Sequence, residues 1–291
     1  MKLEHIAREG GRLSKVLREE MGMSISLMNK LKWEERLLVN GTPCHTDYAV
    51  QPGDTVIALL PDAAPEYPAE AGPLTILYED EHLLAVDKPA GMLIHPSRAC
   101  FTGTLANFVL GYYQRTNQSC AFHPVTRLDR DTFGVVLLAK NAHIHARMIE
   151  KLHNGQLKKT YFALVAGQPP QEGRIDAPIA RREKPSLLRY VDESGKPCLT
   201  VYSRLETRES YSLLRLHPIT GRTHQLRVHC AHIGHPVLGD PQYGNESSRA
   251  LSKEMGIFTQ ALCAGELEFT HPVTGKEISL KTTYKITDEV K

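Results

Sequence analysis

Several charged side chains stand immediately before an apolar segment near the middle of the chain. The residues TRLDRDTFG occupy positions 126–134 and are followed by VVLLA at 135–139. A carboxylate next to a core strand is costly to desolvate, so it requires a cationic partner. An aspartate kept ionised in this way can act as a nucleophile or stabilise a developing positive charge. Asp129 is therefore a candidate catalytic group, and a structural ion-pair turn is the alternative interpretation.

Asp131 stands two residues after Asp129, which invites comparison with the paired carboxylates of glycosidases. Groups at this spacing are held by backbone geometry and are not placed across a sugar. We therefore disfavour an acid/base pair and expect Asp131 to cap the turn through backbone amides.

A second group of polar side chains covers GRTHQLRVH at 221–229, followed by HPVLGDPQYG at 235–244. On a helix from about residue 223, His224 and His229 diverge, and His229 and His232 lack a third ligand, which disfavours a metal site. Recognition of a phosphate or carboxylate fits a helix N-terminus and guanidinium groups better. The candidate anion-binding residues are Arg222, His224, Gln225 and Arg227.

Two further segments carry weaker signals. In KTYFALV (159–165), Tyr161 lies on an alternating strand and could present its ring to a base or belong to the core. In VDKPAGMLIHP (86–96), the turn at Lys88 could line a cleft or only connect two strands.

These segments need a scaffold, and the hydrophobic pattern predicts more strands than helices. Because the strands do not alternate strictly with helices, we assign residues 74–291 to an α+β domain. The predicted strands cover residues 74–78, 82–86, 134–139, 161–166, 199–206, 211–217 and 267–270. The predicted helices cover residues 103–115, 142–153 and 223–233.

The first 60 residues form a separate pattern. Helices are predicted from Arg12 and from Ser24 or Ser26, and Asn40-Gly41 predicts a hairpin turn. Residues 61–73, PDAAPEYPAEAGP, are too poor in apolar side chains to pack, so we predict a linker. The helices would display basic side chains that could follow a phosphate backbone or be solvated, namely Arg12, Lys15, Arg18, Lys30 and Lys32.

Composition narrows the class of protein. The chain has 291 residues, of which 41% are hydrophobic, which fits two globular domains. The net charge is only +2, but residues 101–230 carry 19 Lys and Arg against 10 Asp and Glu, which suits a polyanionic partner. The start of the chain is too charged for a signal peptide, and no apolar run approaches the roughly 18 residues of a membrane span. We expect a cytoplasmic protein whose six scattered cysteines are reduced thiols.

Taken together and in order, the motifs VDKPAGMLIHP, TRLDRDTFG, KTYFALV, GRTHQLRVH and HPVLGDPQYG resemble the RluA family of pseudouridine synthases. The resemblance covers residues from about 74 to 285. Residues 10–60 resemble the S4-type RNA-binding domain that many members carry. The resemblance implies a mixed, largely antiparallel sheet with flanking helices, preceded by a small S4-like α/β unit.

The same resemblance implies an isomerase that detaches uracil from ribose in RNA, rotates the base and rejoins it through carbon, without cofactor or metal. It implies that Asp129 is the essential carboxylate and that Arg227 pairs with it. Tyr161 would stack on the uracil and assist proton removal from C5, and Arg127 would fill the place of a flipped base. We expect RNA contacts from Arg127, Lys88, Arg222, His224 and Gln225, ribosomal or transfer RNA as substrate, and a monomer.

Two positions depart from the usual HRLDxxTSG pattern, because Thr126 replaces histidine and Phe133 replaces serine. In the S4-like unit, KWEER at 32–36 replaces the usual glycine-containing turn. A non-catalytic RNA-binding protein on the same fold is the alternative hypothesis.

Overall fold

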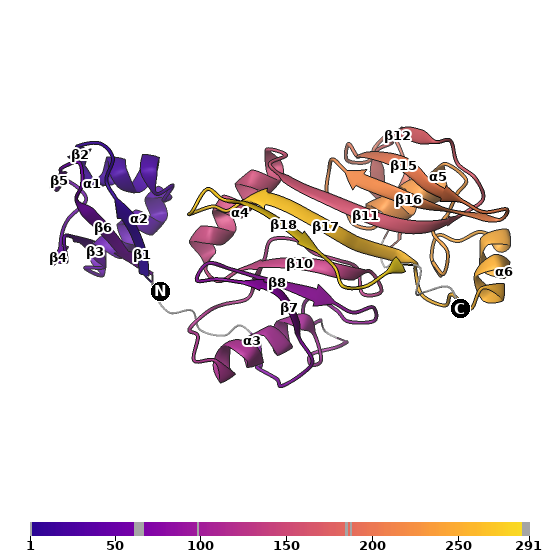
Figure 1. Ribbon diagram of the computed structural model, residues 1–291, viewed down its shortest axis with the longest axis horizontal. Coiled ribbons are helices and arrows are strands. Elements are labelled where there is room, and N and C mark those ends of the chain that lie inside the picture. The colour runs from indigo at the N-terminus through magenta and orange to yellow at the C-terminus, as the bar shows by residue number, and fades with distance from the viewer. Residues whose placement is uncertain (1, 61–66, 98, 184–185, 187, 287–291) are drawn as a thin grey trace.

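The computed structural model describes residues 2–60, 67–97, 99–183, 186 and 188–286. An N-terminal unit comprises residues 2–60 and has its own core, built from residues between Leu3 and Leu60 (Figure 1). A four-stranded sheet in the order β1-β6-β3-β4 packs with the short helices. The elements are β1 (Lys2–Ile6), β2 (Gly11–Arg12), α1 (Leu13–Lys15), the π-helical turn η1 (Val16–Glu20), α2 (Ile25–Trp33), β3 (Leu37–Val39), β4 (Thr42–Pro43), β5 (Ala49–Val50) and β6 (Thr55–Leu59).

Both local signals predicted in this unit are present. The Ser24 side chain caps α2 by accepting a hydrogen bond from the backbone N–H of Leu27 at 3.2 Å. Asn40 and Gly41 have φ values of 49° and 81°, the left-handed conformation that a tight hairpin between β3 and β4 requires.

The predicted linker lies partly outside the described residues, since 61–66 are not described. Residues 67–73 form no helix or strand, yet they pack along α3 (Leu105–Arg115). Asn107 donates from Nδ2 to the carbonyl of Pro68 at 2.8 Å, and the Glu70 backbone N–H donates to the carbonyl of Asn107 at 3.0 Å. Hydrogen bonds to Asn107 and the packing of Tyr67 against the core beside α3 therefore hold this segment.

The rest of the chain is built on a ten-stranded sheet in the order β12-β15-β16-β11-β17-β10-β8-β7, with β9 and β18 at its sides. Neighbouring strands are antiparallel except for β10 and β17, which confirms the predicted mixed, largely antiparallel α+β fold. The strands are β7 (Thr75–Glu79), β8 (Leu83–Lys88), β9 (His123–Pro124), β10 (Phe133–Ala139), β11 (Leu157–Ala166), β12 (Glu172–Asp176), β15 (Leu199–Thr207), β16 (Tyr211–Pro218), β17 (Leu262–Thr270) and β18 (Glu277–Lys281). A small hairpin pairs β13 (Ile179–Arg181) with β14 (Arg189–Val191).

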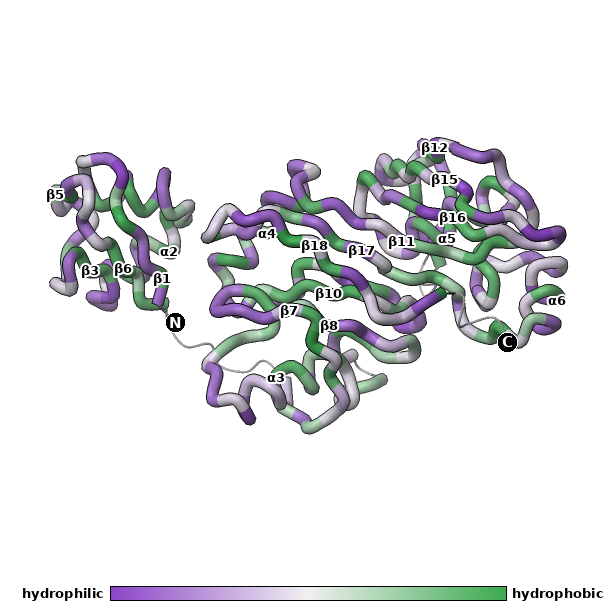
Figure 2. Tube along the Cα trace, viewed as in Figure 1, coloured by the Kyte–Doolittle hydropathy of each residue, from purple (hydrophilic) through white to green (hydrophobic). Residues whose placement is uncertain are grey.

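Helices cover both faces of one half of this sheet. Every residue of β8 and β10 is buried, because alternate side chains enter two different cores. Leu84 and Val86 pack with α3, whereas Leu83 and Ala85 pack with α4 (Ala142–His153). Figure 2 shows hydrophobic residues along these strands and hydrophilic residues in the loops around them.

The other half of the sheet packs on α5 (Gln225–His232) and α6 (Glu246–Glu254). β11 joins the two halves, since it lies between β16 and β17 in the sheet order. All six cysteines are free thiols, as predicted. No helix in the described part of the chain combines the length and apolar content needed to cross a bilayer.

Candidate active site

Asp129 lies in the turn that leads into β10. The backbone N–H of Thr132 donates to the carbonyl of Asp129 at 3.2 Å, which closes the turn just before the buried strand. The Asp129 side chain is 28% exposed, so the carboxylate is accessible at the surface of the core. Asp131 accepts hydrogen bonds from the Arg130 side chain at 3.1 and 3.2 Å, rather than from the backbone amides that we expected.

Arg227, on α5, connects this turn to the other half of the domain. Its Nη1 donates to Asp129 Oδ2 at 3.0 Å. Its Nε and Nη2 donate to the two oxygens of Asp240 at 2.7 and 2.8 Å, and Nη2 also donates to Gln242 Oε1 at 2.9 Å. Burial works to lower the pKa of Arg227, but the hydrogen bonds and charges of the two aspartates outweigh it and raise that pKa. The guanidinium is therefore a permanent cation beside Asp129.

Asp240 and Tyr243 complete the cluster and were not among our predicted site residues. The Asp240 side chain is fully buried and also accepts hydrogen bonds from the backbone N–H groups of Gln242 and Tyr243. The Arg227 guanidinium lies 5.0 Å from the centre of the Tyr243 ring. The segment GDPQY at 239–243 was noted in the sequence, but its sequence does not show which cationic side chain Asp240 pairs with.

His224 approaches Asp129 from the residue before α5. Its Nε2 lies 4.0 Å from Asp129 Oδ2, and its Nδ1 lies 2.7 Å from the Tyr243 hydroxyl. Burial lowers the pKa of His224; the charge of Asp129 opposes this effect, and Arg227 and Arg189 add to it. The imidazole is therefore predominantly neutral at pH 7.

Lys88, at the end of β8, is completely buried beneath the same turn. Its Nζ donates to the carbonyls of Pro89, Met92 and Arg130 at 2.8, 2.9 and 2.8 Å. Burial lowers its pKa to about 8, against the opposing charges of nearby aspartates. Lys88 thus fastens the Asp129 turn to the segment after β8 and is not exposed to a ligand.

Tyr161, on β11, packs against apolar residues from both halves of the sheet. Burial raises the pKa of its hydroxyl, and the charge of Asp129 adds to the effect, so the group keeps its proton at neutral pH. A bulge between Thr160 and Tyr161 shifts the register against β17 at this point.

The remaining predicted residues separate into exposed and buried positions. Arg127 and Arg222 are exposed, as an RNA contact requires. Gln225 is buried, accepts hydrogen bonds from the Thr220 hydroxyl and the Arg222 backbone N–H, and donates to the carbonyl of Leu199. Its amide therefore organises the loop before α5.

The arrangement matches a known family. The family model described as RNA pseudouridylate synthase matches residues 82–232. An uncharacterised RNA pseudouridine synthase of Bacillus subtilis, YjbO, is 37% identical over 259 residues, which cover 88% of this chain and 89% of that protein. The chain belongs to the RNA pseudouridylate synthase family.

Other relatives agree with this assignment. Ribosomal large subunit pseudouridine synthase D of Escherichia coli K12 is 34% identical over 280 residues, which cover 92% of this chain and 86% of that protein. Human RNA pseudouridylate synthase domain containing 1 superposes with a TM-score of 0.60 at 27% identity, covering 75% of this chain and 86% of the human chain. The chain is thus an RNA pseudouridine synthase, an isomerase, and the predicted RluA-type resemblance is confirmed. The assignment favours the enzyme over the non-catalytic alternative.

The two motif departures have structural partners in this pseudouridine synthase. Thr126 is buried, and its hydroxyl accepts a hydrogen bond from the Leu137 backbone N–H at 2.9 Å. Phe133 is buried and packs edge-on against Tyr284, with 5.7 Å between ring centres. These contacts fix the two ends of the segment 126–133, which contains Asp129.

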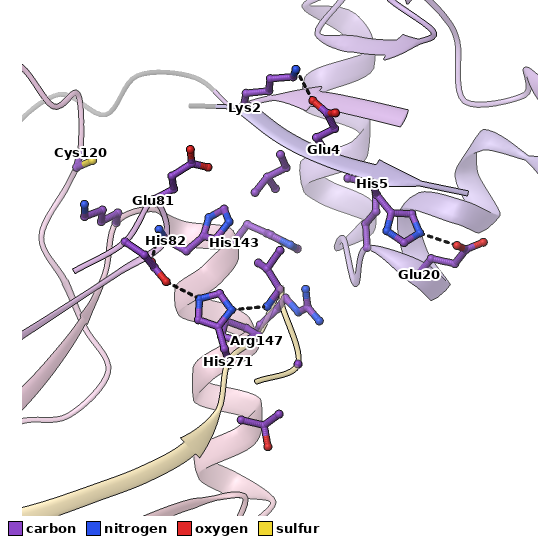
Figure 3. Close-up of a pocket in the computed structure, with 18 of the residues that line it drawn as sticks. Lys2, Glu4, His5, Glu20, Glu81, His82, Cys120, His143, Arg147 and His271 are labelled. Atoms are coloured by element: carbon purple, nitrogen blue, oxygen red, sulfur yellow. Dashed lines mark hydrogen bonds and ion pairs between the residues drawn. The ribbon is translucent and has the colours of Figure 1, made fainter. Parts of the chain in front are cut away.

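A cavity of about 1150 Å³ lies elsewhere in the enzyme, where the N-terminal unit faces α4 and the turn between β7 and β8 (Figure 3). Two of its histidines face carboxylates, His5 with Glu20 at 2.6 Å and His271 with Asp80 at 2.9 Å. None of its lining residues belongs to the Asp129 cluster, so this cavity is separate from the candidate active site.

Proposed function

We propose that Asp129 is the catalytic carboxylate of this pseudouridine synthase. The observation that carries the proposal is the partly exposed Asp129 held at 3.0 Å by a buried Arg227 that is itself anchored on Asp240. The guanidinium orients the carboxylate through a charge-assisted hydrogen bond. An ionised carboxylate is what the reaction needs, since breaking the bond between N1 and C1′ requires attack at C1′ or stabilisation of positive charge there.

The other groups divide into those that meet the substrate and those that hold the site. In the reaction the N1–C1′ bond breaks, a C5–C1′ bond forms, and the proton on C5 is released. We infer that Tyr161 stacks on the uracil, with its hydroxyl protonated, and that Arg127 fills the place of the flipped base. Stacking of about 1–3 kcal/mol per base helps to offset the cost of extruding the nucleotide. Lys88 and Gln225 would act by holding loops, because both are buried.

We propose large-subunit ribosomal RNA as the substrate, ahead of transfer RNA. Several relatives that match most of this chain are named ribosomal large subunit pseudouridine synthase D. We further propose that residues 1–60 are an S4-like unit that binds the same RNA, that residues 74–291 are the catalytic domain, and that the enzyme is a monomer. The unit displays the exposed cations Arg12 and Arg18, which border a cavity of about 450 Å³.

Replacing the carboxylate by an amide tests the proposed role of Asp129. The substrate is ribosomal RNA that has been labelled with [5-³H]uridine in cells that lack the enzyme and then purified. The Asp129→Asn protein should release no tritium from this RNA. The matched control is Asp131→Asn. Among the described residues, Asp131 forms its ion pair with the exposed Arg130 in the same turn, and its replacement should leave the rate within about two-fold. Unchanged tritium release by a folded Asp129→Asn protein would refute the proposal.

Mapping of pseudouridines in the source cells tests the substrate. Cells that carry Asp129→Asn in place of the native copy should lose one or a few pseudouridines in large-subunit ribosomal RNA. Loss of sites in transfer RNA alone would assign the enzyme to that RNA instead.

A further inference from the structure

Tyr243 connects His224 to the backbone of the β14 strand. The backbone N–H of Arg189 donates to the Tyr243 hydroxyl oxygen at 3.0 Å, and His224 Nδ1 lies 2.7 Å from the same oxygen. A tyrosine hydroxyl carries one hydrogen, and this hydrogen is satisfied when it is donated to Nδ1. We therefore assign the proton of the neutral imidazole to Nε2.

His224 Nε2 lies close to the candidate catalytic carboxylate. Nε2 lies 4.0 Å from Asp129 Oδ2, too far for a hydrogen bond but within about 1 Å of one. Arg227 already donates to Oδ2, and Oδ1 has no hydrogen-bond partner among the described residues. A second donor on Oδ2 would leave Oδ1 as the oxygen that faces the substrate.

The backbone at His224 supports a functional reason for this placement. His224 has φ 58° and ψ 18°, a left-handed conformation that is unfavourable for a residue with a Cβ atom. Such strained positions concentrate at functional sites. The ring packs edge-on against Tyr243, with 5.7 Å between ring centres, so its orientation is fixed by contacts on that side.

The charges around the imidazole balance one another. The groups that face it are the carboxylates of Asp129 and Asp240, the guanidiniums of Arg227 and Arg189, and the hydroxyl of Tyr243. Burial is the largest influence and lowers the pKa of His224. Burial and the hydrogen bond with Tyr243 both favour the neutral form with a proton on Nε2.

We propose that His224 is a positioning residue that closes onto Asp129 Oδ2 through its Nε2 proton when RNA fills the site, and that Tyr243 sets its tautomer. This inference rests on the proposed role of Asp129. It gives Arg227 and His224 different tasks, since Arg227 supplies the permanent charge and His224 fixes which carboxylate oxygen is presented to C1′.

Two substitutions of His224 separate the hydrogen bond from the backbone conformation. Asparagine accepts the left-handed conformation, but its amide ends near the position of Nδ1 and cannot reach Asp129. Glutamine places an amide N–H near the position of Nε2. His224→Asn should lower kcat for tritium release by about 100-fold with KM within about two-fold, whereas His224→Gln should recover at least a tenth of the wild-type kcat.

Tyr243→Phe tests the tautomer through pH. The tyrosine hydrogen bond to Nδ1 favours neutral histidine, so its removal should raise the pKa of His224. The resulting imidazolium would bind Asp129 too tightly. As the pH is lowered, kcat of the variant should therefore begin to fall at a higher pH than kcat of the wild type. The double variant Tyr243→Phe/His224→Gln should lose this pH shift, because glutamine does not titrate. The control is Tyr113→Phe, since the buried Tyr113 hydroxyl has no hydrogen-bond partner in the described structure.

The outcomes are distinct. Wild-type kcat in His224→Asn, equal decreases in His224→Asn and His224→Gln, or a pH shift that survives in the double variant would each overturn the inference. If the Asp129→Asn variant retains activity, the proposed role of Asp129 fails as well. That outcome is distinguishable, because it is measured on a different variant from those of His224 and Tyr243.

Discussion

The buried guanidinium of Arg227 balances two carboxylates that differ in exposure. Asp240 is fully buried and Asp129 is 28% exposed, while the Arg227 side chain is only 5% exposed. Transfer of an ionised carboxylate into a protein interior is tolerated only when a charge partner and hydrogen bonds compensate it. Arg227 therefore serves the stability of the fold and the charge state of the candidate site with the same side chain.

Removal of this guanidinium should destabilise the protein strongly. Arg227→Ala leaves Asp240 buried without a cation, and breaking a buried pair in this way costs about 3–5 kcal/mol of unfolding free energy. Urea denaturation at pH 7 measures the decrease. Arg130→Ala is the matched control, because Arg130 is 63% exposed and its pair with Asp131 should contribute less than about 1 kcal/mol. Equal midpoints for the two variants would contradict the buried-pair account.

At the scale of elements, the junction between β10 and β17 depends on a glycine. Gly134 has φ +112° and pairs with Ala264 on the parallel strand. A Cβ atom at this position would lie 2.3 Å from the Ala264 carbonyl oxygen, a distance that real structures do not tolerate. Only glycine fits at this second position of β10, five residues after Asp129.

Gly134→Ala should therefore lower the unfolding free energy by more than the strained backbone conformation alone would. We expect a decrease in stability of about 3 kcal/mol or more, because the strained φ and the overpacked contact add. Gly275→Ala is the control, since Gly275 has φ +71° with nothing within 4 Å of the added Cβ, and should cost only about 1–2 kcal/mol. Chemical denaturation measures the decrease in unfolding free energy of both variants. Similar decreases would show that β17 shifts to accommodate the added Cβ atom.

The predictability of the elements follows from how much apolar surface each one buries. The strands β8 and β10 were predictable because each contains a short continuous run of apolar residues. The strand β16 was predictable because its apolar side chains alternate with others. The strand β1 (KLEHI), the strand β12 (EGRID) and the helix α6 (ESSRALSKE) were not predicted, since each buries few apolar side chains and is fixed by its neighbours. Likewise, Asp129 and Arg227 could be proposed from motifs, but the anchoring of Arg227 on Asp240 depends on a fold that brings separate segments together.

At the scale of the whole molecule, basic charge is divided between two places. Residues 101–230 hold an excess of nine positive charges, and the N-terminal unit, in which acidic and basic side chains are equal in number, exposes the cations Arg12 and Arg18. His143 of α4 and Met21 of that unit line the same cavity. We have proposed that both parts bind the RNA, so its affinity should depend on salt.

Neutralising the N-terminal cations should weaken RNA binding without changing the chemical step. For the double variant Arg12→Gln/Arg18→Gln, the slope of log Kd against log salt should fall by about 0.7–0.9 for each RNA phosphate that the variant no longer neutralises, while kcat stays unchanged. Filter binding to ribosomal RNA across a series of KCl concentrations measures the slope. Arg174→Gln/Arg208→Gln is the control, because both arginines are paired with carboxylates at 2.8 and 3.4 Å. Equal slopes in both variants would argue against RNA binding by the N-terminal unit.

The unequal sharing of Arg227 has a consequence for repeated turnover. Two of its nitrogens bind Asp240, and only one binds Asp129. In the proposed reaction, Asp129 presents Oδ1 to a ribose while Oδ2 keeps its single hydrogen bond to Arg227, and Asp240 holds the arginine in place. After product leaves, the carboxylate still faces a donor that has not moved. The enzyme can therefore reset after each uridine without rebuilding its site.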